Sequence, residues 1–385
     1  MERRQWLLPL TTAVAAAAVT WMVLKRLRDA ASAAARPATA AAARRWLWRR
    51  LPPLPRGRHD HGLEVLEQTL LAVGGHYGRN EQAEWATWAL DLDLDLGGGG
   101  GGVESWRRIG QERQQPPAPG PRGSFGCAVL GGRLCVAGGY GDRNLDDLLE
   151  LRGGGAAWAV VEQLGVRPSL RSGATLTTVA AETALLFGGF GADAPLNDLY
   201  RLRLPPGGGV GEWSAVSAAP DRAAESGLPP PRCAHTAVLT RGDLHVFGGY
   251  GPDGPQNDHW VLSLSNHSWT RRGPPTGPAA GGAPWPSPRS GHSCVAVGGG
   301  RMLLFGGVGH DGEAMADLWE FAPAAAGTAA GWRPVAAEGL GPSARYNHRA
   351  VLLPPRSPGG AATVAVVGGY ADCKASPECF ALEEA

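Results

Sequence analysis

The sequence lacks the motifs that identify most metal and nucleotide sites. Its six cysteines include no Cys-x-x-Cys pair with histidine partners, so a zinc site has no support. The six-glycine run at 97–102 lacks the Lys-Ser/Thr ending of a phosphate-binding loop. The polar residues show no arrangement of nucleophile, base and acid. The sequence therefore predicts no catalytic residues, no metal site and no cofactor.

An excess of charge of one sign is also missing, because 36 basic and 35 acidic residues leave a net charge of +1. The distribution is uneven. Residues 1–58 hold twelve basic and two acidic residues, whereas the remainder holds 24 basic and 33 acidic ones. The mildly acidic main part does not offer the basic surface that nucleic acid requires, so nucleic acid is not expected as a partner.

Glycine, by contrast, is abundant and periodic. Six Gly-Gly pairs each follow a short apolar run, as in LCVAGG, and recur every 50 to 64 residues. The pairs are Gly74-Gly75, Gly138-Gly139, Gly188-Gly189, Gly248-Gly249, Gly306-Gly307 and Gly368-Gly369. A repeat of this length, built from short strands and turns, predicts a β-propeller with one blade per repeat.

Four other residue types keep a fixed place relative to each pair. An arginine precedes the pair by 16 or 17 residues in five units and by 23 in the last: Arg58, Arg122, Arg171, Arg232, Arg289 and Arg345. A histidine lies three residues after the arginine in four units: His61, His235, His292 and His348. An acid follows each pair: Glu84, Asp147, Asp198, Asp258, Asp317 and Glu378. A tryptophan comes next in five units: Trp106, Trp158, Trp213, Trp269 and Trp332.

We interpret each part as one strand of a four-stranded blade. The arginine opens the innermost strand, and the almost wholly apolar run before Gly-Gly is a second strand buried on both faces. The alternating segment after the acid is a half-buried third strand. The tryptophan lies on the outer strand, where we expect it to pack against the next blade. Each histidine is expected to bridge groups inside its own blade. The alternative is a ring of histidines that line the channel as metal ligands, although two of the six positions are Phe125 and Ala174.

This order of parts resembles the kelch repeat over about residues 45–385. The resemblance implies an all-β fold, a six-bladed propeller. The last unit ends after its third strand without a tryptophan strand, whereas the segment Arg45-Trp46-Leu47-Trp48 lies ahead of the first arginine. We therefore expect an N-terminal strand to complete the last blade, which removes two free sheet edges.

The chain before the propeller predicts a membrane segment. Residues 5–24 are uncharged, and at about 1.5 Å per residue a helix over them spans a hydrocarbon core of about 30 Å. We interpret residues 1–24 as a basic cap and a transmembrane signal anchor, 25–44 as an Ala-rich linker and 45–385 as the propeller. Positive charge is heavier after the span, so the propeller is expected in the cytosol. A mitochondrial or other organelle presequence, a cleaved secretory signal and an unstructured tail remain alternatives.

The arginine series supplies the candidate binding residues. The resemblance implies that the start of the inner strand lies near one mouth of the central channel, where arginines of some kelch substrate receptors meet carboxylates. A planar guanidinium suits this because it can donate two hydrogen bonds to one carboxylate. The candidates are Arg171, Ser172, Arg232, Arg289, Ser290, Arg345 and Tyr346. The alternative is that each arginine pairs with the acid of its own blade.

The sequence thus favours a non-enzymatic interaction module, a membrane-anchored monomer that binds a protein or peptide at one mouth of the propeller. One alternative is a substrate receptor of a ubiquitin ligase, although no separate helical adaptor segment is present. A sugar-isomerase-type propeller enzyme is a further alternative, since fold alone does not fix function.

Overall fold

The computed structural model describes residues 44–77, 83–92, 105–109, 119–152, 157–207, 209–216, 219–220, 227–274, 284–325, 329–357 and 359–385. The chain separates into residues 1–42 and residues 43–385. All described residues belong to the second unit. The predicted membrane helix, the linker up to residue 43 and the six-glycine run lie outside the described residues. Within the described part, no helix is long and apolar enough to cross a membrane.

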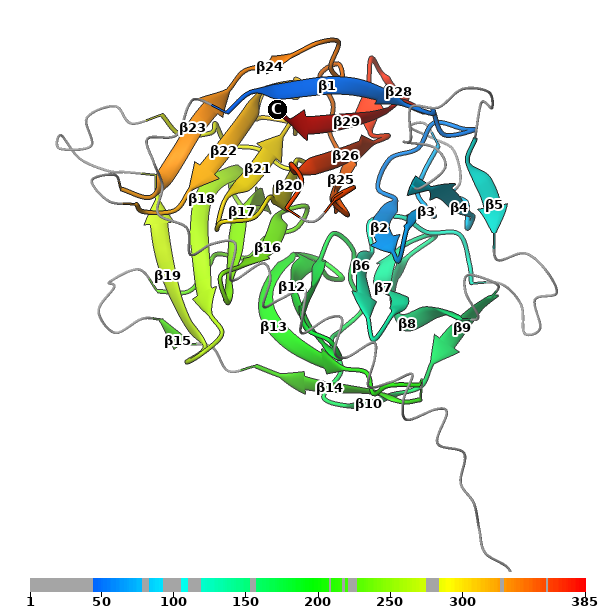
Figure 1. The fold of residues 1–385 in the computed structure, drawn as a ribbon. Helices are drawn as coiled ribbons and strands as arrows, with labels where there is room; N and C mark the ends of the chain where they lie inside the picture. Colours follow the sequence, from blue (N-terminus) through cyan, green and yellow to red (C-terminus); the bar gives the residue numbers. More distant parts are fainter. Residues whose placement is uncertain are drawn as a thin grey trace, which may run out of the picture. The chain divides into compact units, whose positions relative to one another are not determined.

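In the described part of the chain, six mainly antiparallel sheets surround a central axis and form the six blades of a propeller, as predicted (Figure 1). Each blade is given from its inner to its outer strand. Blade 1 contains β2 (Gly62–Leu66), β3 (Thr69–Val73), β4 (Thr87–Asp91) and β5 (Arg107–Ile109). Blade 2 contains β6 (Gly126–Leu130), β7 (Arg133–Tyr140), β8 (Asn144–Arg152) and β9 (Ala157–Val161). Blade 3 contains β11 (Thr175–Ala180), β12 (Thr183–Phe190), β13 (Pro195–Arg203) and β14 (Gly211–Ala215).

The second half of the ring repeats this order. Blade 4 contains β16 (Thr236–Thr240), β17 (Asp243–Gly251), β18 (Gly254–Ser263) and β19 (Ser268–Gly273). Blade 5 contains β20 (Ser293–Ala296), β21 (Met302–Phe305), β22 (Leu318–Ala322) and β23 (Gly331–Val335). Blade 6 contains β25 (Arg349–Leu353), β26 (Thr363–Val367), β29 (Cys379–Glu384) and β1 (Trp46–Leu51). A hairpin of β27 (Tyr370–Ala371) and β28 (Lys374–Ala375) connects β26 to β29.

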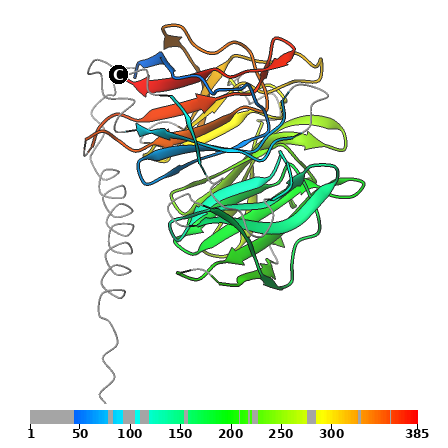
Figure 2. The ribbon, with the colours of Figure 1, turned by 90° about the vertical axis from the view of Figure 1, so that its right-hand side faces the viewer.

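The predicted closure of the ring is confirmed. Strand β1 pairs antiparallel with β29 over its full length, from Trp46 opposite Glu384 to Leu51 opposite Cys379. Figure 1 and Figure 2 both show the blue N-terminal strand beside the red C-terminal one. The first described strand and the last are therefore neighbours in blade 6, and their pairing closes the ring.

Three blades carry a fifth outer strand that the sequence did not predict. These strands are β10 (Gln163–Gly165), β15 (Ala219–Pro220) and β24 (Ala337–Glu338). They pair parallel with β14, β19 and β1 respectively, and each belongs to the segment that leaves the preceding blade. Each therefore connects two neighbouring blades at the outer edge of the propeller. Their sequences show no strand pattern, because two or three residues are too few for a period.

The core consists of apolar layers between neighbouring blades, and the outer-strand tryptophans fill them. The expected direction of packing was wrong: each of these tryptophans packs against the preceding blade. Trp269 of blade 4, for example, lies 5.2 Å from Phe187 of blade 3 between ring centroids, and Trp332 of blade 5 lies 5.0 Å from Phe247 of blade 4. The repeat specifies the period of the tryptophans but not which of the two neighbouring blades they face.

The Gly-Gly pairs sit where two blades meet. The N–H of the second glycine donates to the backbone carbonyl of the next blade's arginine, at 2.8–2.9 Å in all six units. Gly248 shows why glycine is needed: its φ is +57°, and a Cβ there would lie 2.8 Å from the carbonyl oxygen of Arg289. A side chain at this position would be strained and would also push the blades apart.

Substitution of Gly248 should separate these two effects. Gly248→Ala is expected to lower the free energy of unfolding by about 1–3 kcal/mol more than Gly242→Ala, because it adds steric overlap to backbone strain. Gly242 in the β16–β17 turn is the matched control, with φ +84° and nothing within 4 Å of the place that a Cβ would occupy. Chemical denaturation of both variants measures the difference. Equal costs would show that the close approach between blades contributes nothing.

Candidate functional site

A central channel of about 550 Å³ runs between the six inner strands. Residues at or just before the start of these strands, among them Asp60, Ser124, Ser172 and Asn347, line it together with Phe190 at the end of β12. These residues follow or flank the arginine positions. The mouth at this end of the channel is therefore the candidate functional site.

The mouth is framed by a closed belt of backbone hydrogen bonds. In each blade the residue two positions after the arginine donates its backbone N–H to the backbone carbonyl of the residue at the equivalent position in the preceding blade, at 2.6–2.9 Å. The belt residues are Asp60, Ser124, Gly173, Ala234, Gly291 and Asn347. All six have positive φ, between 50° and 63°. The bond from Asp60 to Asn347 closes the circle, so the diameter of the mouth depends on all six blades.

The six arginine side chains lie just behind this belt and are almost fully buried, with 0–3% exposure. Each guanidinium donates to the carbonyl of the first glycine in its own blade's Gly-Gly pair, at 2.8–3.4 Å. In blades 2 to 6 it also donates to the blade's acid. Arg232, for example, makes two bonds to Asp258 at 2.7 and 2.8 Å. In blade 1 Tyr77 stands between Arg58 and Glu84.

The candidate arginines are therefore placed as the alternative interpretation expected, paired inside their own blades. Arg171 and Asp198, Arg289 and Asp317, and Arg345 and Glu378 repeat the arrangement. Burial of Asp258 opposes ionisation, but the hydrogen bonds and charge of Arg232 hold its pKa below the ordinary value. Asp317 has a lowered pKa for the same reason, with Arg289 as its partner.

The other three candidates are the residues next to the arginines. Ser172, Ser290 and Tyr346 each directly follow an arginine and form a β-bridge with the residue directly after the Gly-Gly pair: Phe190, Val308 and Tyr370. Ser172 and Tyr346 are half-buried, and Ser290 is 7% exposed. Of these three residues, Ser172 lines the central channel, whereas the channel lining does not include Ser290 or Tyr346.

The residues after the Gly-Gly pairs were missed by sequence reasoning. Three consecutive blades place a large exposed aromatic side chain there: Tyr140 is 46% exposed, Phe190 37% and Tyr250 49%. Their positions were readable in the sequence, because each directly follows its glycine pair. What the sequence did not show is that this position faces solvent beside the mouth.

The histidines join neighbouring blades, which corrects the expectation that they bridge groups inside one blade. The Nε2 atoms of His235, His292 and His348 lie 2.9–3.0 Å from hydroxyl groups of the preceding inner strand: Thr175, Thr236 and Ser293. Burial lowers the pKa of His292 to about 3 and the pKa values of His235 and His348 well below the ordinary value. These imidazoles are neutral structural groups.

The channel wall is polar on the side of blades 6 and 1. Arg349 donates through Nε to the carbonyl of His61 at 2.9 Å. Arg349 occupies the position at which the inner strands of blades 3, 4 and 5 carry a hydroxyl residue that contacts the histidine of the following blade. His61 of blade 1 therefore has no hydroxyl partner on the preceding inner strand. Burial raises the pKa of nearby Glu64 to about 8, and the charge of Arg349 counteracts this. The channel therefore holds the guanidinium of Arg349 near a buried carboxyl group whose pKa is raised.

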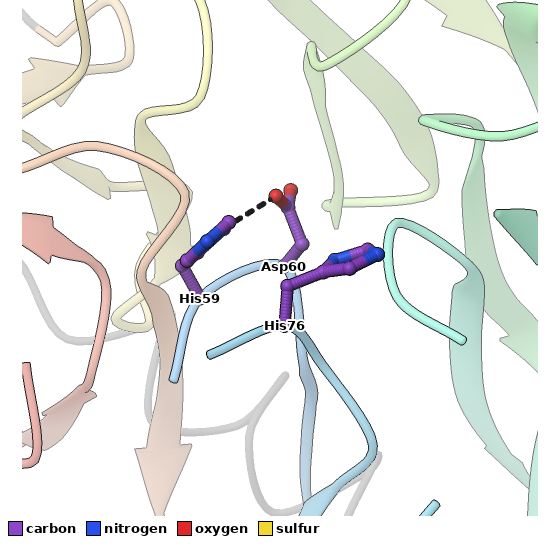
Figure 3. A group of neighbouring side chains, drawn as sticks. All are labelled: His59, Asp60 and His76. Atoms are coloured by element: carbon purple, nitrogen blue, oxygen red, sulfur yellow. Dashed lines mark hydrogen bonds and ion pairs between the residues drawn. The ribbon is translucent and has the colours of Figure 1, made fainter. Parts of the chain in front are cut away.

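One further group of side chains gathers at the mouth in blade 1. The Nδ1 atom of His59 lies 2.8 Å from Oδ2 of Asp60, and the rings of His59 and His76 are stacked with centroids 5.6 Å apart (Figure 3). Asn347 Nδ2 donates to the same Asp60 oxygen at 3.0 Å. Burial lowers the pKa of His76 below its ordinary value, although the charge of Asp60 opposes this. The sequence predicted no metal site, and it did not single out this trio.

The fold and this site define a class of protein: a closed six-bladed β-propeller whose blades are held by buried arginine–glycine contacts around one mouth. Residues 154–356 match the KLHDC2/KLHL20/DRC7 Kelch-repeats domain. The chain belongs to the kelch-repeat family, as the repeat pattern implied.

Curated relatives agree with this family. The chain is 32% identical to the dynein alpha chain of the flagellar outer arm from Chlamydomonas reinhardtii over 204 residues, covering 51% of this chain and 4% of that protein. It is 30% identical to host cell factor 1 from Homo sapiens over 277 residues, covering 66% of this chain and 12% of the relative. A leucine-zipper-like transcriptional regulator 1 homolog from Drosophila melanogaster is 28% identical, covering 57% and 21%. The aligned regions thus make up a small part of these relatives. Kelch propellers of this family serve in protein–protein interaction.

The arginine–acid pair predicts a stability effect. Asp258→Asn should lower the free energy of unfolding by about 3–5 kcal/mol at neutral pH, because it leaves the guanidinium of Arg232 buried without its counter-charge. The depressed pKa of Asp258 means that this contribution is present above the unfolded-state pKa of about 4 and is lost as the pH falls through the folded-state value. Denaturation of both proteins at neutral and acidic pH should show the difference shrinking in acid.

The control is Glu212→Gln, because Glu212 and Arg203 are 3.7 Å apart with side chains 62% and 61% exposed. Its cost should stay below about 1 kcal/mol. A cost at Asp258 as small as at Glu212 would contradict the structural role of the buried pair.

Proposed function

We propose that this chain is a non-enzymatic interaction module that binds a protein or peptide partner on the mouth face of its propeller. The observation that carries the proposal is the row of exposed aromatic side chains on blades 2, 3 and 4, at Tyr140, Phe190 and Tyr250. Large exposed aromatic groups next to a concave surface are typical anchors of protein interfaces. Membership of a family of interaction propellers supports the same function.

The polar residues beside the arginines complete the proposed surface. Ser172 is half-buried beside Phe190 on blade 3, and Tyr346 is half-buried beside Tyr370 on blade 6. Ser290 on blade 5 is 7% exposed and contributes less surface. The arginines contribute mainly by fixing these neighbours, since their guanidinium groups are engaged inside the blades. Substitution of Arg289 or Arg345 would therefore test stability together with binding. Surface substitutions give the cleaner experiment.

The test is proximity labelling with the full-length protein and a mouth variant, Tyr140→Ser/Phe190→Ser/Tyr250→Ser. Losing an aromatic anchor costs about 2 kcal/mol or more of binding free energy, so recovery of the true partners should fall at least about tenfold. Melting temperatures measured in parallel should stay close to the wild type, because all three side chains are exposed.

The control variant is Leu164→Ser/Val166→Ser/Leu340→Ser. These residues are 52%, 60% and 68% exposed and lie away from the mouth, in segments that follow outer strands. The control should keep the partners that the mouth variant loses. The reverse result, with the partners lost only in the control, would place the interaction on the outer edge of the propeller and overturn the proposal.

We also propose that residues 5–24 anchor the propeller to a membrane with its blades in the cytosol. The support is the uncharged stretch of 20 residues and the basic residues that follow it. A full-length protein with a C-terminal fluorescent tag should resist carbonate extraction, and protease added to intact organelles should remove the tag. Val14→Arg/Val19→Arg should release it, at about 2.5–3.5 kcal/mol of insertion free energy per charge. A tag protected from protease would favour a secretory signal or a presequence instead.

A further inference from the structure

The trio of His59, Asp60 and His76 has the geometry of a ligand set. One nitrogen or oxygen atom of each side chain lies within 4.8 Å of the others. Among the residues that the structure describes, no other group of three histidine, cysteine, aspartate or glutamate side chains meets this condition. Figure 3 shows the Asp60 carboxylate between the two imidazole rings.

The backbone holds the two histidines together. His59 and His76 form a β-bridge with both hydrogen bonds made, at 3.1 and 2.9 Å. Asp60 adopts φ +56° as part of the belt. On the far side, Gly123 of blade 2 leaves room for the ring of His76, since a Cβ there would lie 2.4 Å from its Nδ1. Three separate features of the fold therefore fix the three side chains.

The fold itself does not require these residue types. At the positions of His59, Asp60 and His76, the other five blades carry Gly123, Ser124 and Tyr140; Ser172, Gly173 and Phe190; Cys233, Ala234 and Tyr250; Ser290, Gly291 and Val308; and Tyr346, Asn347 and Tyr370. The belt and the bridge form in all of these blades. A structural role alone therefore does not explain why blade 1 combines two imidazoles with a carboxylate.

We propose that His59, Asp60 and His76 form a binding site for a divalent transition-metal cation, with three protein ligands and a further position open at the mouth. Two imidazoles and one carboxylate are a donor set that suits zinc and its first-row neighbours. The side chains of His59 and Asp60 are 14% and 17% exposed, so the site is shielded yet reachable. Among the described residues, the buried Nδ1 of His76 has no hydrogen-bond partner.

The existing contacts fit such a site. The bond between His59 Nδ1 and Asp60 Oδ2 uses two of the donor atoms, and coordination would replace it with two bonds to the cation. Asn347 already donates to Asp60 and would remain as an outer partner that orients the carboxylate. The inference is independent of partner binding at the mouth, because it concerns only these residues and the cation.

The test is calorimetric titration of chelator-treated full-length protein with Zn²⁺. The wild type should bind one Zn²⁺ per chain at this site. His59→Ser and Asp60→Asn should each weaken this binding more than tenfold, since loss of a direct ligand exceeds the roughly 10–100-fold effect of losing an outer partner. The ring already contains both replacements at equivalent positions, as Ser172 and as Asn347 with φ +53°, so the variants should fold.

The matched control is His310→Ser, which removes an exposed histidine from another blade. It should leave the affinity unchanged. Parallel titrations with Co²⁺, Ni²⁺ and Mn²⁺ identify the preferred cation, and Mg²⁺ should not compete. Absence of saturable one-to-one binding by any of these transition metals would overturn the proposal. So would wild-type affinity in either His59→Ser or Asp60→Asn with its melting temperature preserved, or an equal loss of affinity in His310→Ser.

Discussion

The structure depends on one contact between arginine and glycine that is made six times. Each guanidinium holds the carbonyl of the first glycine in its own blade, and the N–H of the second glycine holds the backbone carbonyl of the next blade's arginine. The side chain thus stabilises the blade, and the backbone of the same arginine binds the blade before it. Because the last link runs from Gly369 back to Arg58, the series has no end.

This contact also determines what the mouth can offer to a partner. The arginines are engaged within the blades rather than by a carboxylate from outside, and the acid before or within the third strand provides their counter-charge. The groups left at the surface are the immediate neighbours of the arginines and glycines. Blades 2 to 4 present aromatic side chains there, whereas blade 1 presents two imidazoles and a carboxylate. A symmetric framework therefore carries an asymmetric face, on which binding specificity can depend.

Most of the fold was predictable because the repeat restates each requirement six times. The period of the glycine pairs gave the number of blades, and the missing tryptophan strand of the last unit predicted the pairing of β1 with β29. Relations between blades were predicted less well. The tryptophans pack on the preceding blade, the histidines bridge two blades, and β10, β15 and β24 cross between blades. These features depend on the twist and spacing of packed sheets, which a period along one chain does not specify.

By itself, then, the sequence determined the six-bladed kelch ring and its closure, and it left the pairing of arginine with acid as one of two interpretations. Local patterns suffice for these, since burial and charge complementarity recur in every unit. Only the tertiary structure decided which side chains share the mouth. His59 and His76 are separated by a whole hairpin in the chain, and Tyr140 and Phe190 belong to different blades. Such residues meet because the ring brings the starts of the inner strands and the ends of the second strands to one place, and that neighbourhood exists only after all six blades have packed.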